Sequence, residues 1–271
     1  MGYTRPTTTT RDMLVAAPLP NHGKTYTVIP HKDVIDVTKT LLDNNGFRIT
    51  KELYRANMNA KVAQGVYHLA SDQDPEMGMM FAWTNSYDKS TRFQCAVGAF
   101  VNVCSNGMLC GDMANYARKH TGKADHDIHT QISSQIKSAN KYYTKLINDK
   151  NEMRKIFLPK KDQAELVGRL FLDEEIIDAS QVSVIKAEMK EPSYDYKADL
   201  NNAWTFYNHI THALKRSHPR TWMSDQVKFH EFMTAELLSQ AALKKQDTSW
   251  PVDFIADMEA QEYDTFEEFK I

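Results

Sequence analysis

Cysteine is scarce in this sequence of 271 residues, which contains only Cys95, Cys104 and Cys110. The count is low and odd, and the first ten residues are rich in threonine without an apolar leader segment. A disulfide framework needs paired cysteines and an export route. These absences therefore predict reduced thiols and a cytoplasmic setting.

Long apolar runs and glycine-rich loops are also missing. No stretch approaches the roughly 18–20 apolar residues that a membrane span requires. The ten glycines do not cluster, and neither the Walker A pattern nor the G-x-G-x-x-G pattern occurs. The sequence therefore argues against a membrane protein, a P-loop NTPase and a dinucleotide-binding enzyme, and it predicts no cofactor.

Histidine and cysteine do not form a recognisable metal-ligand pattern. His126 and His129 are three positions apart with His120 nearby, and five residues separate Cys104 from Cys110. Structural zinc sites need four nitrogen or sulfur ligands at short, repeated spacings, and neither group supplies them. We therefore predict no metal site.

Cys104 lies beside a polar turn, an arrangement that raises the question of nucleophilic catalysis. It precedes Ser105-Asn106-Gly107, and His120 follows downstream. A Cys–His pair needs a lowered thiol pKa and a third group that orients the histidine. Because Asn106-Gly107 is also typical of a tight turn after an apolar strand, a structural role is the simpler interpretation. We predict no enzymatic activity and keep a Cys104–His120 enzyme as the third functional alternative.

Charge is unevenly distributed, although the net charge is only −2. The segment from Asp253 to Ile271 contains seven acidic residues and one lysine, so it carries −6 and residues 1–252 carry +4. Its acids alternate with aromatic residues, which favours binding to a basic site or to the groove of a partner protein. An amphipathic C-terminal helix packed on the body is the other interpretation.

Hydrophobic periodicity predicts a helix followed by extended segments. Residues 31–45 have a helical pattern and end at Asn44-Asn45-Gly46, a good C-terminal stop. Strands are expected at residues 24–30, 47–56, 61–70, 78–85 and 92–103, the first as a short edge strand. Helices are expected at residues 108–119, 127–157, 162–172, 173–179, 198–216 and 226–244.

This order predicts an α+β fold. An antiparallel β-meander of about four strands follows an N-terminal helix, helices pack on one side of the sheet, and the C-terminal half is mostly helical. The expected organisation is a flexible N-terminal arm (1–23), an α+β core domain (24–158), a helical region packed on that core (159–250) and an acidic aromatic C-terminal tail (251–271).

Basic and aromatic residues recur together on the predicted strands. A single-strand nucleic-acid site combines a basic groove, which follows the phosphates, with aromatic side chains on which bases stack. The predicted phosphate contacts are Arg48, Arg55, Lys61, Lys89, Arg92, Arg118 and Lys119, and the predicted stacking residues are Tyr54, Tyr67 and Tyr87. The competing interpretation is that strand aromatics belong to the core and that the charges form a solvated face.

Three stretches of the sequence together resemble a known family. They are Asn85 to Ser90, Gly98 to Met108, and Arg118 to Gly122, and the segment from Asn202 to Thr211 is similar to a later helix of that family. The family is domain of unknown function 932, encoded by phages and plasmids, and the resemblance covers roughly residues 24–244. It implies a mobile-element origin but brings no established activity and no catalytic residue. The topology is also similar to that of phage single-strand-annealing proteins.

The leading hypothesis is a phage-type single-stranded DNA-binding protein that acts in recombination by annealing complementary strands as a homo-oligomer. It would work in the cytoplasm of the host if a phage encodes it. The main alternative is a protein-interaction factor for host takeover, without enzymatic activity, which binds its partner through the acidic residues 253–271.

Overall fold

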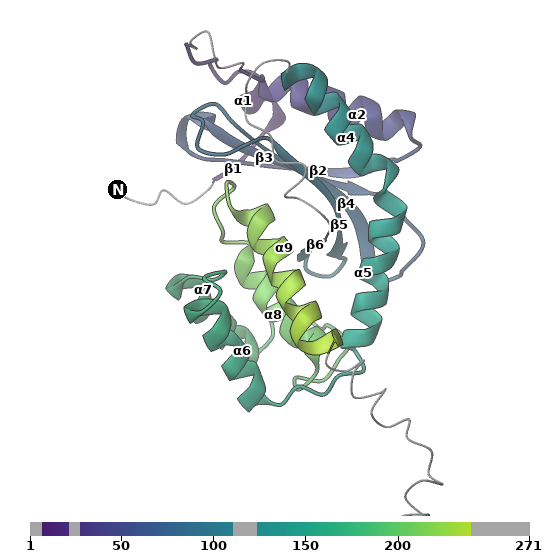
Figure 1. Cartoon of the computed structure of the whole chain (residues 1–271), viewed down its shortest axis with the longest axis vertical. Coiled ribbons are helices and arrows are strands. Elements are labelled where there is room, and N and C mark those ends of the chain that lie inside the picture. Colours follow the sequence, from purple (N-terminus) through teal and green to yellow (C-terminus); the bar gives the residue numbers. More distant parts are fainter. Residues whose placement is uncertain (1–6, 22–27, 111–123, 240–271) are drawn as a thin grey trace, which may run out of the picture.

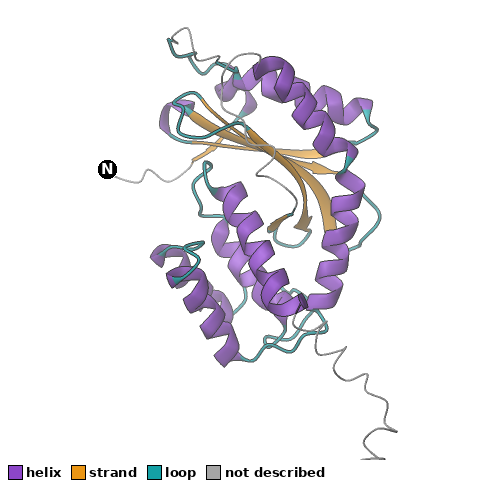
Figure 2. Ribbon diagram, in the orientation of Figure 1, coloured by secondary structure: helices purple, strands orange, loops and turns teal. Residues whose placement is uncertain are grey.

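The computed structural model describes residues 7–21, 28–110 and 124–239. Its centre is a six-stranded antiparallel sheet in the order β1-β2-β3-β4-β5-β6. Helices lie over both faces of this sheet (Figures 1 and 2). The predicted α+β class is confirmed, whereas the expectation of helices on one side only is wrong.

The strands run through the sheet in sequence order, so the predicted meander is present with two additional strands. Their bounds are β1 (Thr7–Thr9), β2 (Ile49–Ala56), β3 (Val62–Leu69), β4 (Met77–Ser86), β5 (Gln94–Val101) and β6 (Gly107–Leu109). The four central strands match predicted segments. β1 forms in part of the predicted flexible arm because Thr7–Thr9 pair with the edge of β2. β6 replaces the start of the helix that was expected after Gly107.

The first face of the sheet carries most of the hydrophobic core. It is covered by α1 (Arg11–Val15), α2 (His31–Asn44), α4 (Ala124–Lys137) and α5 (Ala139–Met153). α2 ends at the predicted stop, because Gly46 adopts a positive φ of 78° and its N–H donates to the Asp43 carbonyl at 2.9 Å. The single helix expected at residues 127–157 is divided into α4 and α5 at Ser138.

The C-terminal helices cover only part of the second face of the sheet. The helices of this half of the chain are α6 (Lys160–Leu172), α7 (Ala179–Lys190), α8 (Ala203–Leu214), α9 (Trp222–Met233) and the π-helix η2 (Thr234–Ser239). Trp222, Met223 and Val227 of α9 pack on Met80 and Leu109, which belong to β4 and β6. Val66 of β3 packs against the margin of this apolar cluster and stays half-buried, whereas β2, which is fully described, contributes no residue to it.

Some predictions fail or fall outside the described residues. No helix forms at residues 173–178, and α7 was not predicted. Residues 28–30 of the expected edge strand are not part of the sheet, and residues 24–27 are not described. The acidic tail (251–271), residues 1–6 and residues 111–119 of an expected helix are also not described. No helix within the described ranges has the length and apolar composition needed to cross a membrane.

Candidate functional site

A groove of about 1190 Å³ separates the second face of β2 and β3 from the C-terminal helices. Its floor consists of three cross-strand pairs, Lys51 with His68, Leu53 with Val66, and Arg55 with Gln64. These residues alternate along each strand, so all six side chains emerge on the same face. The walls are the start of α7, the segment between α8 and α9, and the first turn of α9. This feature is called the groove below.

Arg55 lies at the centre of the polar part of the floor. One guanidinium nitrogen donates to the Ser217 carbonyl at 2.5 Å, and the other donates to Gln64 Oε1 at 3.4 Å. Burial lowers the pKa of Arg55 to about 10, so the side chain stays protonated at neutral pH. The contact with Ser217 joins β2 to a segment 162 positions away in the sequence and fixes one wall of the groove.

Basic side chains continue along the wall. Lys215 donates to the Cys104 carbonyl at 2.5 Å, and burial lowers the pKa of its amine. Arg216 is exposed, and so is Lys51 on the floor. Burial and then the charges of Arg220 and Arg55 lower the pKa of His218, so this imidazole is neutral at pH 7. The groove therefore has fixed positive charge from four lysines and arginines.

Three carboxylates in the lining reduce this positive charge. Asp178 caps α7 by accepting from the Gln181 N–H at 2.9 Å, and Glu175 is exposed just before it. Burial raises the pKa of Asp225 to about 6, against the opposing effect of hydrogen bonds from Ser217 and Thr221. The lining is thus weakly positive at neutral pH, and it becomes more positive as Asp225 takes up a proton.

Two aromatic rings other than the predicted tyrosines border the groove, and both are buried. The His68 ring stacks on Phe100 at a centroid distance of 3.6 Å, and burial lowers its pKa to about 4. Trp222 borders the groove at the start of α9, although most of its ring is packed against the sheet. Both rings are only 6% exposed, so the half-buried Leu53–Val66 pair is the part of the floor against which a base can pack.

Tyr54, Tyr67 and Tyr87 are buried, which corrects their predicted role as stacking residues. The Tyr54 hydroxyl donates to Glu52 at 2.7 Å, and the Tyr67 hydroxyl accepts from the Trp83 indole at 3.2 Å. The Tyr87 hydroxyl accepts from a backbone N–H at 2.7 Å, and its ring is stacked on a histidine. Their rings belong to the packed interior, so they have no free face for a base.

The predicted basic residues are not brought together at one place. Among those that the structure describes, only Arg55 lines the groove. Lys61 lies in the β2–β3 turn, and its carbonyl accepts from the N–H of Tyr87, so the turns at this end of the sheet are neighbours. Lys89 and Arg92 follow in the β4–β5 turn, and Arg48 precedes β2 at the opposite end. Arg118 and Lys119 lie outside the described residues.

Sequence reasoning missed most of the groove. The groove residues absent from the predicted set include Lys51, His68, Lys215, Arg216 and His218. Period-two alternation along β2 was an available signal for Lys51, because it shares a face with Arg55. No local sequence pattern predicts the wall residues, since tertiary packing alone brings them to the strands.

The alternative chemical sites receive no support from the described residues. Cys104 is buried, and burial raises the pKa of its thiol, which is the opposite of what a nucleophile requires. Its suggested partner His120 is not described, nor is the side chain of His126. Among the side chains that are described, no three potential ligands are grouped as a metal ion needs.

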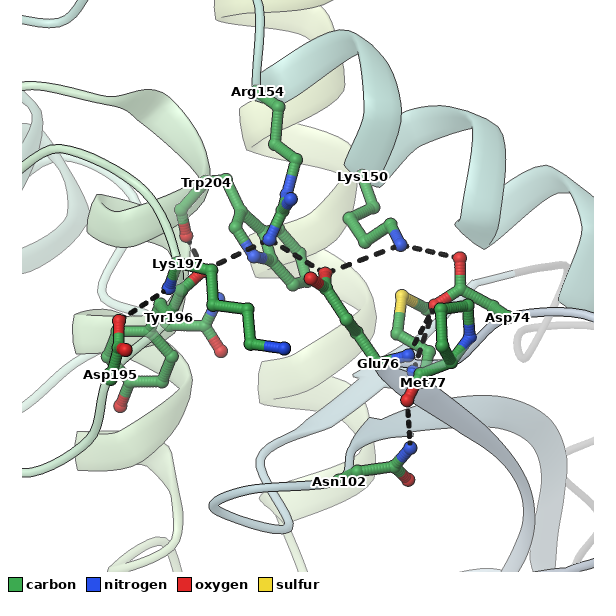
Figure 3. A network of polar contacts seen from close by, with 12 residues as sticks. Asp74, Glu76, Met77, Asn102, Lys150, Arg154, Asp195, Tyr196, Lys197 and Trp204 are labelled. Carbon is green, nitrogen blue, oxygen red and sulfur yellow. Dashed lines mark hydrogen bonds and ion pairs between the residues drawn. The ribbon is translucent and has the colours of Figure 1, made fainter.

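A buried ion network lies at the start of β4, at the opposite end of that strand from the β4–β5 turn (Figure 3). Lys150 of α5 donates to Asp74 at 2.5 Å, and its amine lies 3.7 Å from Glu76. Arg154 contacts Glu76 at 2.7 Å and donates to the Tyr196 carbonyl at 3.0 Å. Asp74 also accepts from two backbone N–H groups at the start of β4. The network therefore joins the sheet to α5 and to the segment that leads into α8.

Comparison with known proteins gives a family but no characterised relative. No curated protein and no solved structure matches this chain. The family model described as Domain of unknown function (DUF932) matches residues 18–249. This range includes every element that forms the groove and the ion network except β1. The chain therefore belongs to the DUF932 family.

Proposed function

We propose that this protein binds single-stranded nucleic acid, with the groove as the binding site. The observation that carries the proposal is the partly buried Arg55 on the floor, accompanied by Lys51, Lys215 and Arg216 along the lining. Cationic side chains supply the phosphate contacts that dominate affinity for nucleic acids.

The groove also supplies a surface for bases. Leu53 and Val66, both half-buried, form an apolar strip on the floor between Lys51 and Arg55. A strand lying along β2 and β3 would place phosphates near the basic side chains and bases near this strip. Cationic side chains that contact the backbone, beside an apolar surface that contacts bases, favour single-strand binding without sequence preference.

A phage-type role in recombination extends this proposal. Annealing of complementary DNA strands by a homo-oligomer is supported by the order of helix and antiparallel strands, which is an analogy of topology. Binding of one strand in the groove is the step that annealing requires first, and it is the step that the following experiment tests.

Reversing two exposed charges of the groove is expected to weaken oligonucleotide binding. Lys51→Glu combined with Arg216→Glu should raise the Kd for a labelled 30-nucleotide DNA strand about 10- to 100-fold at low salt, since two phosphate contacts become repulsive. The slope of log K against log salt should fall by about 0.7 for each phosphate contact that the substitutions remove. Fluorescence anisotropy over a salt series measures both quantities.

The matched control is Lys141→Glu combined with Lys161→Glu. Both lysines are exposed on α5 and α6, outside the groove lining, and the change in net charge is the same. The control should change the Kd less than threefold. Equal weakening by both double variants would show that binding depends on net charge alone and would contradict the groove as the site.

The protein-interaction alternative depends on the acidic residues 253–271. If the groove binds nucleic acid, a chain ending at residue 252 should bind the oligonucleotide severalfold more tightly, because removing a charge of −6 lowers the repulsion of phosphates. Anisotropy with the full and the shortened chain measures this change. Absence of binding by both would reject the nucleic-acid proposal and favour a protein partner for the tail.

A further inference from the structure

The charge of Arg55 is not neutralised within the described structure. The side chain is partly buried, yet it forms no ion pair with a carboxylate of the described residues. Its two hydrogen bonds go to a backbone carbonyl and to an amide oxygen, both of which are uncharged. A desolvated charge without a counter-ion is costly for a fold, and a ligand of opposite charge removes that cost.

Gln64 is the cross-strand neighbour of Arg55, and it has unused hydrogen-bonding capacity. Its side chain is 1% exposed, and its Oε1 accepts from Arg55. The remaining donor, Nε2, has no hydrogen-bond partner among the described residues. Buried donors are nearly always satisfied, so an unpaired one next to a guanidinium that has no carboxylate partner marks a place where an acceptor can bind.

We infer that Arg55 and Gln64 form a subsite for one phosphate group of the nucleic-acid strand, an internal phosphodiester. The inference rests on the proposed function for the source of the phosphate. The planar guanidinium offers paired N–H donors that match two oxygens of a phosphate, and Gln64 adds an amide donor beside it. No bond is made or broken in this step.

The charge of the lining favours a phosphodiester over a terminal phosphate. Asp178 and Asp225 line the same groove, and they oppose a second negative charge close to Arg55. An internal phosphodiester carries one negative charge, whereas a terminal phosphate carries close to two at neutral pH. The subsite should therefore not distinguish an oligonucleotide with a 5′-phosphate from one with a 5′-hydroxyl.

The test compares Arg55→Gln and Arg55→Lys with the unaltered protein in anisotropy titrations. The probes are a 12-nucleotide DNA strand with a 5′-hydroxyl and the same strand with a 5′-phosphate. Arg55→Gln should weaken binding of both strands about 10-fold and lower the salt slope by about 0.7. Arg55→Lys should keep the slope and weaken binding about threefold, because the charge remains but the paired donors are absent.

Thermal unfolding with inorganic phosphate at pH 6, where the ion carries mainly one negative charge like a phosphodiester, gives an independent readout that needs no nucleic acid. Phosphate should raise the Tm of the unaltered protein and of Arg55→Lys, but not that of Arg55→Gln. If phosphate changed the Tm in this way but neither oligonucleotide bound, the subsite would be supported and the proposed function would be rejected. A different result would overturn the phosphodiester assignment. The unaltered protein would bind the 5′-phosphate strand more tightly than the 5′-hydroxyl strand, and Arg55→Gln would remove only that difference in Kd.

The subsite itself would be overturned by the following pair of results. Arg55→Gln would retain the Kd and the salt slope of the unaltered protein, whereas Lys51→Glu combined with Arg216→Glu would still weaken binding. In that case the groove would bind the strand, and Arg55 would serve only to hold the Ser217 carbonyl. Should Arg55→Gln fail to fold, Arg55→Lys decides, since equal affinity of this variant and the unaltered protein for both strands would exclude paired donation to a phosphate.

Discussion

Replacing Lys150 by methionine is expected to lower the free energy of unfolding by about 3 to 5 kcal/mol. The Lys150 and Asp74 side chains are only 5% and 7% exposed, and their contact at 2.5 Å joins α5 to the start of β4. Methionine fills a similar volume but leaves the Asp74 carboxylate buried without its counter-ion. For a domain of this size the Tm should fall by roughly 6 to 20 °C, measured by calorimetry or circular dichroism.

Two further variants distinguish the destabilisation caused by an unpaired buried charge from that caused by the loss of any ion pair. Lys155→Met breaks an ion pair of the same length to Glu152, but the two side chains are 62% and 45% exposed, so the loss should stay under about 1 kcal/mol. Adding Asp74→Asn to Lys150→Met should recover part of the stability, because no unpaired charge remains. A Lys150→Met protein as stable as the Lys155→Met control would show that the network contributes little.

The central elements were predictable because their signals are local. The helix at residues 31–45 has its apolar periodicity and its Gly46 stop within one segment, and the four central strands are separated by turn residues. β1 lacked such a signal, since three threonines become a strand only through pairing with the edge of β2. α7 did have one, because Asp178 and Gln181 form a capping box, which is visible in the sequence as D-x-x-Q.

The candidate site was harder to predict than the fold. Tyr54 and Arg55 are adjacent on β2, so their side chains point to opposite faces, and a single surface cannot use both. Composition could not decide which face was covered. Helices α2 and α4 bury the tyrosine face, whereas α9 stops short of β2 and leaves Arg55 in the groove. Which face of β2 is covered depends on contacts between distant segments, and a single sequence does not predict such contacts.

Asp225 gives the groove a dependence on pH that can be measured as stability. Burial raises its pKa in the folded chain to about 6, from an ordinary value of 3.8. The nearby charges act in opposite directions, since Lys228 of the same helix lowers this pKa and Asp178 at the start of α7 raises it. The folded state thus holds the proton more tightly than the unfolded state. Stability is therefore lost as the pH rises from about 4 to about 6.

Asp225→Asn is expected to stabilise the protein by about 2 to 3 kcal/mol at pH 7.5 and to have little effect at pH 4. This magnitude follows from a shift of about two pKa units at about 1.4 kcal/mol each. The amide keeps an oxygen that can accept from Ser217 and Thr221, so packing is preserved while the buried charge is removed. Urea unfolding of both proteins at the two pH values measures the difference.

Asp72→Asn is the matched control, because Asp72 is exposed in the loop before β4. This variant should change the stability by less than about 0.5 kcal/mol at both pH values. Asp225→Asn also removes one negative charge from the groove, so it should tighten oligonucleotide binding severalfold at pH 7.5 but not at pH 5, where the aspartate is already mostly protonated. Equal effects at both pH values would mean that Asp225 titrates normally and that its carboxylate does not control the charge of the groove.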